Sequence, residues 1–276
     1  MKVSKKDVQA SFSGAAASYD QAAVVQNEIL ERLLERLDIL HNGGMPLLDL
    51  GSGTGLAARR LAASVDLQDY VAVDISENML AYAGNILGKY KCVCGDAESL
   101  PFADNSFATV ISASTLQWCN DVGLAFSEVL RTLKTGGLFL FSTFGPDTLS
   151  EIKACFDNID SNPHVNSFVD MHELGDLLAA MGFADIVMES EIITLEYPDP
   201  MQLLRDLQAT GATNRIVDRS RGLLGKQRLN KFLQEYQKFQ SGNGLYPATY
   251  EVIYGHGFRP DTVNNPVQGW QPVKFF

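Results

Sequence analysis

Several features that mark particular classes of protein are missing from this sequence. No run approaches the roughly 18 apolar residues of a membrane helix, and the N-terminus lacks the apolar segment of a secretory signal peptide. The four cysteines, at positions 92, 94, 119 and 155, include no C-x-x-C pair and have no histidine at metal-binding spacing. We therefore predict a cytoplasmic protein without disulfides, a metal site or a membrane partner.

Positive charge is also scarce. The chain has 22 lysines and arginines against 33 acids, a formal net charge of −11, and no nucleic-acid partner is predicted. A hydrophobic content of 46% with 20% charged residues is ordinary for a globular protein. A length of 276 residues favours one large domain with an insertion over two small domains.

The first residues leave an alternative location open. Residues 1–19 contain several serines but only one acid, Asp7, a composition faintly similar to that of an organelle transit peptide. The cytoplasm is the favoured location.

A short strand followed by alternate glycines is the most distinctive local pattern. Leu47–Leu50 is compatible with a strand, glycines occupy positions 51, 53 and 55, and residues 56–63 have the pattern of a helix. Glycine lets a backbone approach a ligand closely, and the N-terminus of a helix offers unpaired N–H groups. A dinucleotide fingerprint needs a glycine where this sequence has Leu56, which argues against NAD.

Asp49 completes the pattern Asp-x-Gly-x-Gly-x-Gly, which resembles motif I of the class I S-adenosylmethionine-dependent methyltransferases. There the acid and the loop hold the methionine part of the cofactor. Asp74 ends an apolar strand 19 residues after Gly55, close to the spacing of about 20 at which an acid reaches ribose hydroxyls. Gly95-Asp96-Ala97 resembles the turn that places an acid beside the adenine amine. The resemblance implies that S-adenosyl-L-methionine is the cofactor and is bound by Asp49, Gly51, Ser52, Gly53, Gly55, Asp74, Ile75, Met79, Asp96, Ala97 and Ser112.

Strand and helix patterns alternate along the chain. Apolar residues at helical spacing predict a helix from Val24 to Leu40. The other predicted elements are strands at 107–112, 137–144, 186–197 and 250–258, and helices at 122–133 and 171–181, the last one capped by Gly182. This alternation predicts a mostly parallel sheet whose ligand crevice lies at the carboxyl ends of the strands.

The resemblance and the alternation together predict an α/β, Rossmann-like class I methyltransferase fold. It has a mostly parallel seven-stranded sheet, helices on both faces and a helical insertion before the last strand. The segment 199–246 is too long for an ordinary connection, and 260–276 has three prolines and few charges. The predicted parts of a domain at 1–259 are an N-terminal helical cap (1–46), a cofactor-binding core (47–198), a helical insertion or lid (199–246) and the last strand (247–259), followed by a flexible tail (260–276).

Several longer strings are more specific than the cofactor motifs. They are Ser18-Tyr19-Asp20, Leu116-Gln117-Trp118, the run from Phe141 to Leu149, Asp206-Leu207 with the run from Ala209 to Asn214, and the run from Pro247 to His256. Through them the chain resembles the malonyl-acyl-carrier-protein O-methyltransferases of biotin synthesis over nearly its whole length. The resemblance implies methyl transfer to the free carboxylate of a malonyl thioester, which masks the charge so that fatty-acid enzymes can elongate the product toward pimeloyl.

What the sequence lacks agrees with that chemistry. A malonyl carboxylate is ionised near neutral pH, because reference carboxyl pKa values lie near 4, so its attack on a sulfonium methyl needs no general base. We therefore expect the protein to accelerate the reaction mainly by positioning the carboxylate against the methyl group. No Ser-His-Asp or Cys-His nucleophile set is found, and His256 lies in an apolar strand pattern that favours a structural role.

The candidate acceptor-side residues come from three regions. Tyr19 precedes the N-terminal helix, and Gln117 and Trp118 follow the fourth strand at the crevice end. Arg205 and Arg215 lie in the insertion, and an arginine can bind a carboxylate through two parallel hydrogen bonds. Asn214 belongs to the same string. A packing role for Tyr19 or Trp118, and a plain surface role for either arginine, stay open.

The region of the insertion is basic, although the chain as a whole is acidic. Residues 201–259 hold nine basic side chains against four acids, which predicts a local docking surface for an acidic acyl carrier protein, with a coenzyme A thioester as the alternative acceptor. A solvated helical face is the alternative reading. Two other functions remain: a respiratory complex I assembly factor, whose relatives share some of these strings, and a cofactor-binding scaffold without catalysis.

Overall fold

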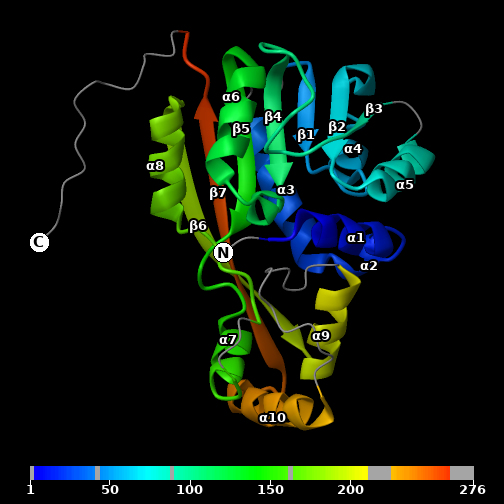
Figure 1. Cartoon of the computed structure of the whole chain (residues 1–276), viewed down its shortest axis with the longest axis vertical. Coiled ribbons are helices and arrows are strands. Elements are labelled where there is room, and N and C mark those ends of the chain that lie inside the picture. Colours follow the sequence, from blue (N-terminus) through cyan, green and yellow to red (C-terminus); the bar gives the residue numbers. More distant parts are fainter. Residues whose placement is uncertain (1–2, 41–43, 88–89, 161–163, 211–224, 262–276) are drawn as a thin grey trace, which may run out of the picture.

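A seven-stranded sheet forms the centre of the molecule (Figure 1). The computed structural model describes residues 3–40, 44–87, 90–160, 164–210 and 225–261. In spatial order the strands are β3 (Lys91–Cys94), β2 (Tyr70–Asp74), β1 (Leu47–Leu50), β4 (Phe107–Ala113), β5 (Leu133–Phe144), β7 (Tyr246–Phe258) and β6 (Ala184–Tyr197). The first five are parallel, and β7 runs antiparallel to both of its neighbours. The predicted mostly parallel sheet is confirmed.

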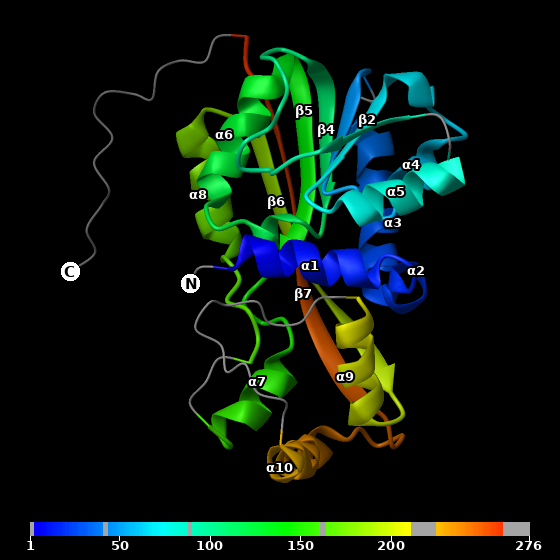
Figure 2. The ribbon, with the colours of Figure 1, turned by 45° about the vertical axis from the view of Figure 1, so that its right-hand side comes forward.

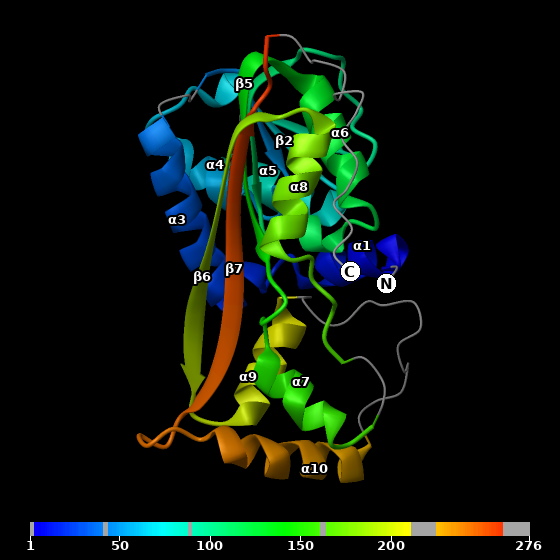
Figure 3. The ribbon, with the colours of Figure 1, turned by 90° about the vertical axis from the view of Figure 1, so that its left-hand side faces the viewer.

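Helices cover both faces of this sheet, as predicted (Figure 3). The helices α3 (Val24–Leu40), α4 (Leu56–Leu61) and α5 (Glu77–Leu87) lie on one face, and α6 (Val122–Thr132) and α8 (Met171–Met181) lie on the other. Strand β2 shows why both faces are apolar. Tyr70 and Ala72 pack with α3, whereas Val71 and Val73 point to the opposite core.

Local signals fix the ends of several helices. Asp121 and Asp170 cap α6 and α8 by accepting backbone N–H groups of the first turn. Gly182 ends α8 in the left-handed conformation, at φ +98°, which glycine adopts without the clash that a Cβ would cause. The predicted bounds of α3 and α8 are confirmed.

A second layer of helices surrounds the far ends of β6 and β7. Only Val252 to Phe258 of β7 pair with β5, so the first half of β7 extends beyond the sheet and pairs with β6 alone. The helices α7 (Ser150–Asp157), α9 (Pro200–Ala209) and α10 (Lys226–Tyr236) pack there (Figures 1 and 3). We call these three helices and the strand ends the helical lobe.

The helical lobe differs from the predicted insertion in its origin. The insertion supplies α9, α10 and the short turn η3 (Gln237–Phe239), but α7 comes from the connection after β5, where no helix was predicted. The ring of Phe156 in α7 stacks on Phe232 in α10 at 5.0 Å, which joins the two segments. Strand β7 begins at Tyr246 rather than at residue 250, because its first residues still pair with β6.

The N-terminal residues form two helices that the sequence reading did not separate. Helix α1 (Lys5–Ala15) crosses the end of the sheet between the strands and the helical lobe (Figure 2), and α2 (Tyr19–Ala22) follows it. The cap and insertion boundaries stay predictions, and the predicted tail lies almost entirely outside the described residues. Over the described part of the chain, no helix has the length and apolar content of a membrane span.

Candidate functional site

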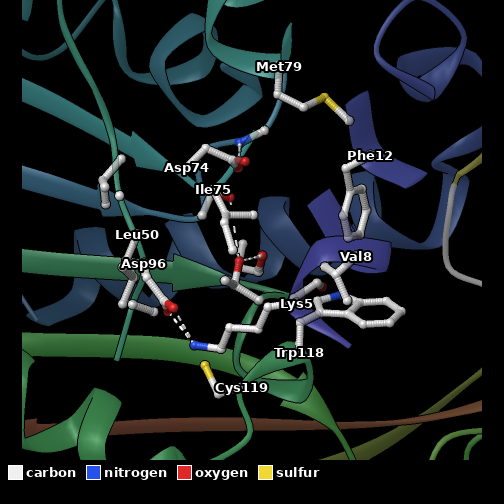
Figure 4. Close-up of a pocket in the computed structure, with 18 of the residues that line it drawn as sticks. Lys5, Val8, Phe12, Leu50, Asp74, Ile75, Met79, Asp96, Trp118 and Cys119 are labelled. Atoms are coloured by element: carbon white, nitrogen blue, oxygen red, sulfur yellow. Dashed lines mark hydrogen bonds and ion pairs between the residues drawn. The ribbon is translucent and has the colours of Figure 1, made fainter. Parts of the chain in front are cut away.

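The main cavity lies under α1, at the carboxyl ends of β1, β2, β3 and β4 (Figure 4). The space in and in front of it, open solvent included, is about 740 Å³. Nine of the predicted residues line it: Tyr19, Gly51, Gly53, Asp74, Ile75, Met79, Asp96, Ala97 and Trp118. These residues lie together because parallel strands bring their carboxyl ends to one edge of the sheet.

The glycine loop after β1 forms one wall. Gly51 has φ +76°, and a Cβ there would lie 2.1 Å from the Thr115 side-chain oxygen, so Thr115 packs directly on the loop. Gly53 has φ +54°, and no heavy atom lies within 4 Å of the place a Cβ would take. That open space faces the cavity, so glycine at position 53 leaves room for a ligand beside the backbone.

Asp74, at the end of β2, is held by the same loop. Its carboxylate accepts the N–H of Gly53 at 2.9 Å and the N–H of Ser76 at 2.8 Å. Burial raises the pKa of Asp74, and these two backbone donors oppose that rise. The carboxylate is thus fixed in direction and lies beside the apolar side chains of Ile75 and Met79.

Lys5 of α1 ties the roof of the cavity to the turn after β3. Its ammonium is 2.5 Å from the carboxylate of Asp96 (Figure 4) and 2.8 Å from that of Glu98, which does not line the cavity. Burial lowers the pKa of Lys5, but the two carboxylates outweigh it and the pKa is raised. Asp96, the predicted adenine ligand, therefore already has a partner within the protein.

Aromatic rings and polar anchors complete the roof. Phe12 of α1 meets Trp118 edge-on, with ring centroids 5.4 Å apart, and lies 6.2 Å from the ring of Tyr19. Burial beside Asp74 and Asp20 raises the pKa of Tyr19, so its phenol keeps its proton and can donate a hydrogen bond.

Further contacts hold α1 to the loop after β2. The side chain of Gln9 donates to the carbonyl of Ile75 at 2.8 Å, and the hydroxyls of Ser13 and Ser76 are 2.8 Å apart. Helix α1 is therefore attached to the rim of the cavity by side-chain contacts along its length.

The α1 contribution was missed in the sequence, although a signal for the helix exists. Ser4 accepts the N–H of Asp7 and caps α1, which is the Ser-x-x-acid pattern of a helix start. Val8 and Phe12 then follow at a spacing of four, on the face that lines the cavity. The lining residues that sequence reasoning missed are Lys5, Val8, Phe12, Leu50, Val73, Gly95, Ala113, Ser114, Thr115 and Cys119.

Five predicted residues lie next to the cavity without lining it. Asp49 is buried behind the loop and accepts the Tyr70 hydroxyl at 2.5 Å, and burial raises the pKa of Asp49 to about 7. Gly55 caps α4, and Ser112 donates to the carbonyl of Leu50. These residues shape the loop and strands. Asp49, Ser52, Gly55, Ser112 and Gln117 do not line the main cavity, and their predicted contacts with a ligand stay predictions.

Gln117 has a bridging position. Its amide donates to the carbonyl of Ser114 at 2.7 Å and accepts from the hydroxyl of Thr143 in β5 at 3.2 Å. It thereby orients the short turn η2 (Leu116–Trp118), which carries Trp118 into the cavity.

Of the two predicted arginines, the described one, Arg205, does not line the main cavity. Arg205 is exposed on α9, whose helix contacts α2, and Asn214 and Arg215 lie outside the described residues. His256 sits in β7 beside Phe258, where burial lowers its pKa, and it does not line the main cavity. Within the described ranges, no cluster of three or more His, Cys, Asp or Glu is placed to hold a metal ion.

Two buried hydroxyls at the site have unused hydrogen-bonding capacity. Among the described residues, the side-chain oxygens of Ser52 and Ser114 have no hydrogen-bond partner. Buried polar groups in folded proteins are usually paired. Ser114 lines the main cavity, at the end of β4, and so offers a polar contact to a ligand there.

Comparison with known proteins gives consistent results. A family model described as a methyltransferase domain matches residues 48–141. The malonyl-[acyl-carrier protein] O-methyltransferase of Gallionella capsiferriformans (strain ES-2) is 42% identical over 267 residues, which cover 94% of this chain and 92% of that protein. The protein of the same name from Nitrosospira multiformis is 40% identical over 277 residues, covering 94% and 90%.

Solved structures share the fold at lower identity. The YcgJ protein from Bacillus subtilis matches with a TM-score of 0.58 at 20% identity, over 82% of this chain and 97% of its own. A Haemonchus contortus phosphoethanolamine N-methyltransferase 2, in complex with S-adenosyl-L-methionine, matches with a TM-score of 0.55 at 20% identity, over 90% and 57%. The predicted class I methyltransferase fold is confirmed by these likenesses and by the strand order.

Proposed function

The chain belongs to the malonyl-[acyl-carrier protein] O-methyltransferase family, and from this premise we propose that it transfers a methyl group from S-adenosyl-L-methionine to the free carboxylate of a malonyl group on acyl carrier protein. The observation that carries the proposal is 42% identity over 94% of the chain, which extends well past the methyltransferase domain at 48–141. These relatives favour a carboxyl methyltransferase over an assembly factor.

The residues of the main cavity fit the methyl donor. Gly53 leaves backbone space open, Asp74 presents a fixed carboxylate suited to ribose hydroxyls, and Ser114 has an unpaired hydroxyl. Ile75 and Met79 supply apolar surface on which an adenine ring can pack. When bound, S-adenosyl-L-methionine supplies an electrophilic methyl, so that an O–CH3 bond forms while the electron pair of the broken S–CH3 bond stays on sulfur.

Positioning of the acceptor carboxylate is the task left to the protein. The carboxylate is already an anion at neutral pH, since reference carboxyl pKa values are about 4, and no side chain needs to remove a proton. Tyr19 can donate a hydrogen bond to it from the roof, and Trp118 can exclude water beside it. Gln117 supports the turn that holds Trp118, and so acts as a positioning residue.

Acyl carrier protein is the proposed partner, with a coenzyme A thioester as a second acceptor, and the cytoplasm is the proposed location. The exposed face of α10 carries Lys226, Arg228 and Lys231, and Lys238 is exposed in the following turn η3. In the described part of the chain, Lys226 and Lys231 have no carboxylate within ion-pair distance, whereas Lys238 pairs with Glu235. A basic face with two lysines that have no ion-pair partner in the described part of the chain, on a protein of net charge −11, favours docking of an acidic protein at this place.

Methyl transfer is tested directly with labelled S-adenosyl-L-methionine and malonyl-acyl carrier protein. We expect the carrier to gain one esterified methyl group by mass spectrometry, whereas butyryl-acyl carrier protein, which has no free carboxylate, gains none. Rescue of a biotin auxotroph blocked at this methylation would connect the activity to the pathway that the family resemblance implies. A protein that binds the donor but methylates no malonyl thioester would instead be a scaffold.

Docking on α10 is tested by charge reversal. The double variant Lys226→Glu with Lys231→Glu should lower turnover of malonyl-acyl carrier protein much more than turnover of malonyl-coenzyme A. The preference should also weaken with salt, because exposed charges are screened beyond roughly 8 Å at physiological ionic strength. Reversal of Lys91 and Lys134, two exposed lysines on the sheet, is the matched control. Equal losses on both acceptors would exclude docking at this face.

A further inference from the structure

A second cavity lies on the helical lobe, between α7 and the chain that follows it. We call it the α7 groove. Pro146, Lys153 and Phe156 line one side, and His164, Ser167 and Phe168 line the other. Its lining thus mixes aromatic surface with an amine, an imidazole, a hydroxyl, the amide of Asn166 and the carboxylate of Asp157. None of its lining residues belongs to the main cavity.

Lys153 gives the α7 groove a positive charge that has no direct counter-ion among the residues the structure describes. The half-buried ammonium donates to the carbonyl of Pro146 at 2.5 Å and lies 5.6 Å from the centre of the Phe168 ring. Among the described residues, no carboxylate lies within ion-pair distance of it. Burial lowers the pKa of Lys153, against the opposing effect of Asp147 and Glu251. A partly desolvated cation of this kind favours an anionic ligand.

The α7 groove connects inward to the main cavity. The ring of Phe168 contacts that of Phe144 with centroids 5.8 Å apart, and Phe144 is the last residue of β5. The preceding residue, Thr143, is bonded to Gln117, whose neighbour Trp118 lines the main cavity. Strand β5 therefore links the groove to the turn that carries Trp118: Phe144 contacts the groove on one face of the strand, and Thr143 contacts Gln117 on the other.

The α7 groove also connects outward to the basic face of α10. His164 stacks on Phe156 with ring centroids 3.6 Å apart and bonds to the carboxylate of Asp160 at 2.9 Å. The guanidinium of Arg228, in α10, lies 3.7 Å from that same carboxylate. A carrier protein docked on α10 would thus meet one rim of the groove.

We propose that the α7 groove receives the phosphopantetheine arm of the malonyl thioester, with the Lys153 ammonium contacting the phosphodiester of that arm. This inference rests on the proposed function. The acceptor carries two anionic groups, and the carboxylate must lie in the main cavity, next to the methyl donor. The anion that meets Lys153, in a groove separate from that cavity, is therefore the distal one. The apolar surface of Phe156 and Phe168 suits the alkyl parts of the arm.

The test compares three acceptors: malonyl-acyl carrier protein, malonyl-phosphopantetheine, and malonyl-pantetheine, which lacks the phosphate. Lys153→Met should lower kcat/KM on the two phosphorylated acceptors by on the order of tenfold, mainly through KM, because a charge-assisted contact is lost. Turnover of malonyl-pantetheine and affinity for S-adenosyl-L-methionine should not change. Lys153→Arg should keep most of the activity. The matched control is Lys134→Met, because Lys134 lies at the start of β5, whereas the α7 groove lies beyond the end of that strand.

A second variant tests the groove itself. Ser167 is exposed on its rim, so Ser167→Trp should fill the groove and impair all three acceptors without altering donor affinity or Tm. If Lys153→Met lowers kcat/KM equally on phosphorylated and unphosphorylated acceptors, Lys153 contacts another part of the substrate and the proposal is overturned. Wild-type kinetics in both variants would overturn it as well. If the wild-type enzyme methylates none of the three acceptors, the proposed function fails instead.

Discussion

Asp74→Asn tests the donor site most sharply, because the two oxygens of Asp74 have different partners. In the structure one oxygen accepts the N–H of Ser76 and the other accepts the N–H of Gly53. An amide can satisfy only one of these donors, since its NH2 group cannot accept. The substitution therefore removes the charge offered to the ribose and disturbs the glycine loop at the same time.

The expected magnitude follows from the bonds that change. Two charge-assisted hydrogen bonds to ribose hydroxyls, at about 1.5–3 kcal/mol each, would be replaced by at most one neutral bond of about 1 kcal/mol. A loss near 3 kcal/mol corresponds to a Kd for S-adenosyl-L-methionine raised by somewhat more than about a hundredfold. Burial raises the pKa of Asp74, so removing the buried charge offsets part of the cost to folding, and Tm should fall only slightly.

Isothermal titration calorimetry with S-adenosyl-L-methionine and with its demethylated product measures this change, and thermal melting checks the fold. Asp66→Asn is the matched control, because Asp66 is an exposed acid that accepts a backbone N–H of Gln68 far from the main cavity. A Kd within about threefold of wild type, in a variant of normal Tm, would show that Asp74 makes no direct contact with the donor.

Three further predictions concern the roof, the buried acid and the arginines. Lys5→Met should speed donor dissociation, followed by the fluorescence of Trp118, because the two ion pairs that fasten α1 to the turn after β3 are lost; an unchanged rate would mean that the roof does not gate release. The pKa of Asp49 is raised to about 7 in the folded protein, so the folded state holds an extra proton between about pH 4 and 7 and stability falls as pH rises through that window. Urea unfolding should show a flatter pH dependence for Asp49→Asn, and an identical slope would contradict this. Arg205→Ala or Arg215→Ala should raise the acceptor KM without altering donor affinity if one of them holds the malonyl carboxylate, and normal kinetics in both would leave that task to Tyr19 and backbone donors.

The parts of the site that the sequence predicted are those fixed by local pattern and by parallel topology. Asp74 and Asp96 each end or follow a strand, and parallel strands deliver such residues to one edge whatever the rest of the chain does. Spacing alone cannot tell which side of the loop a residue faces. Asp49 lies in β1, two residues before Gly51, yet its side chain points behind the loop to Tyr70.

Contacts between segments distant in sequence could not be predicted from local sequence patterns. Lys5 is separated by 91 residues from Asp96, and nothing in the N-terminal residues specifies that partner. Helix α7 was missed because it is only eight residues long, and it is stabilised mainly by burying Phe156 against α10. Tertiary packing thus determined both the roof of the main cavity and the composition of the helical lobe.

The long ribbon of β6 and β7 has a consequence for building chimaeras of this enzyme. Each strand runs unbroken from the sheet into the helical lobe, and one apolar cluster includes residues of both, from Leu33 to Tyr236. The helical lobe should therefore melt together with the sheet rather than as a separate unit. Exchanging acceptor preference between relatives would require transplanting two stretches of chain at once, the one that contains α7 and the one that contains α9 and α10. Swapping the second alone would place the transplanted α10 against the host's Phe156 surface and leave the α7 side of the proposed acceptor groove unchanged.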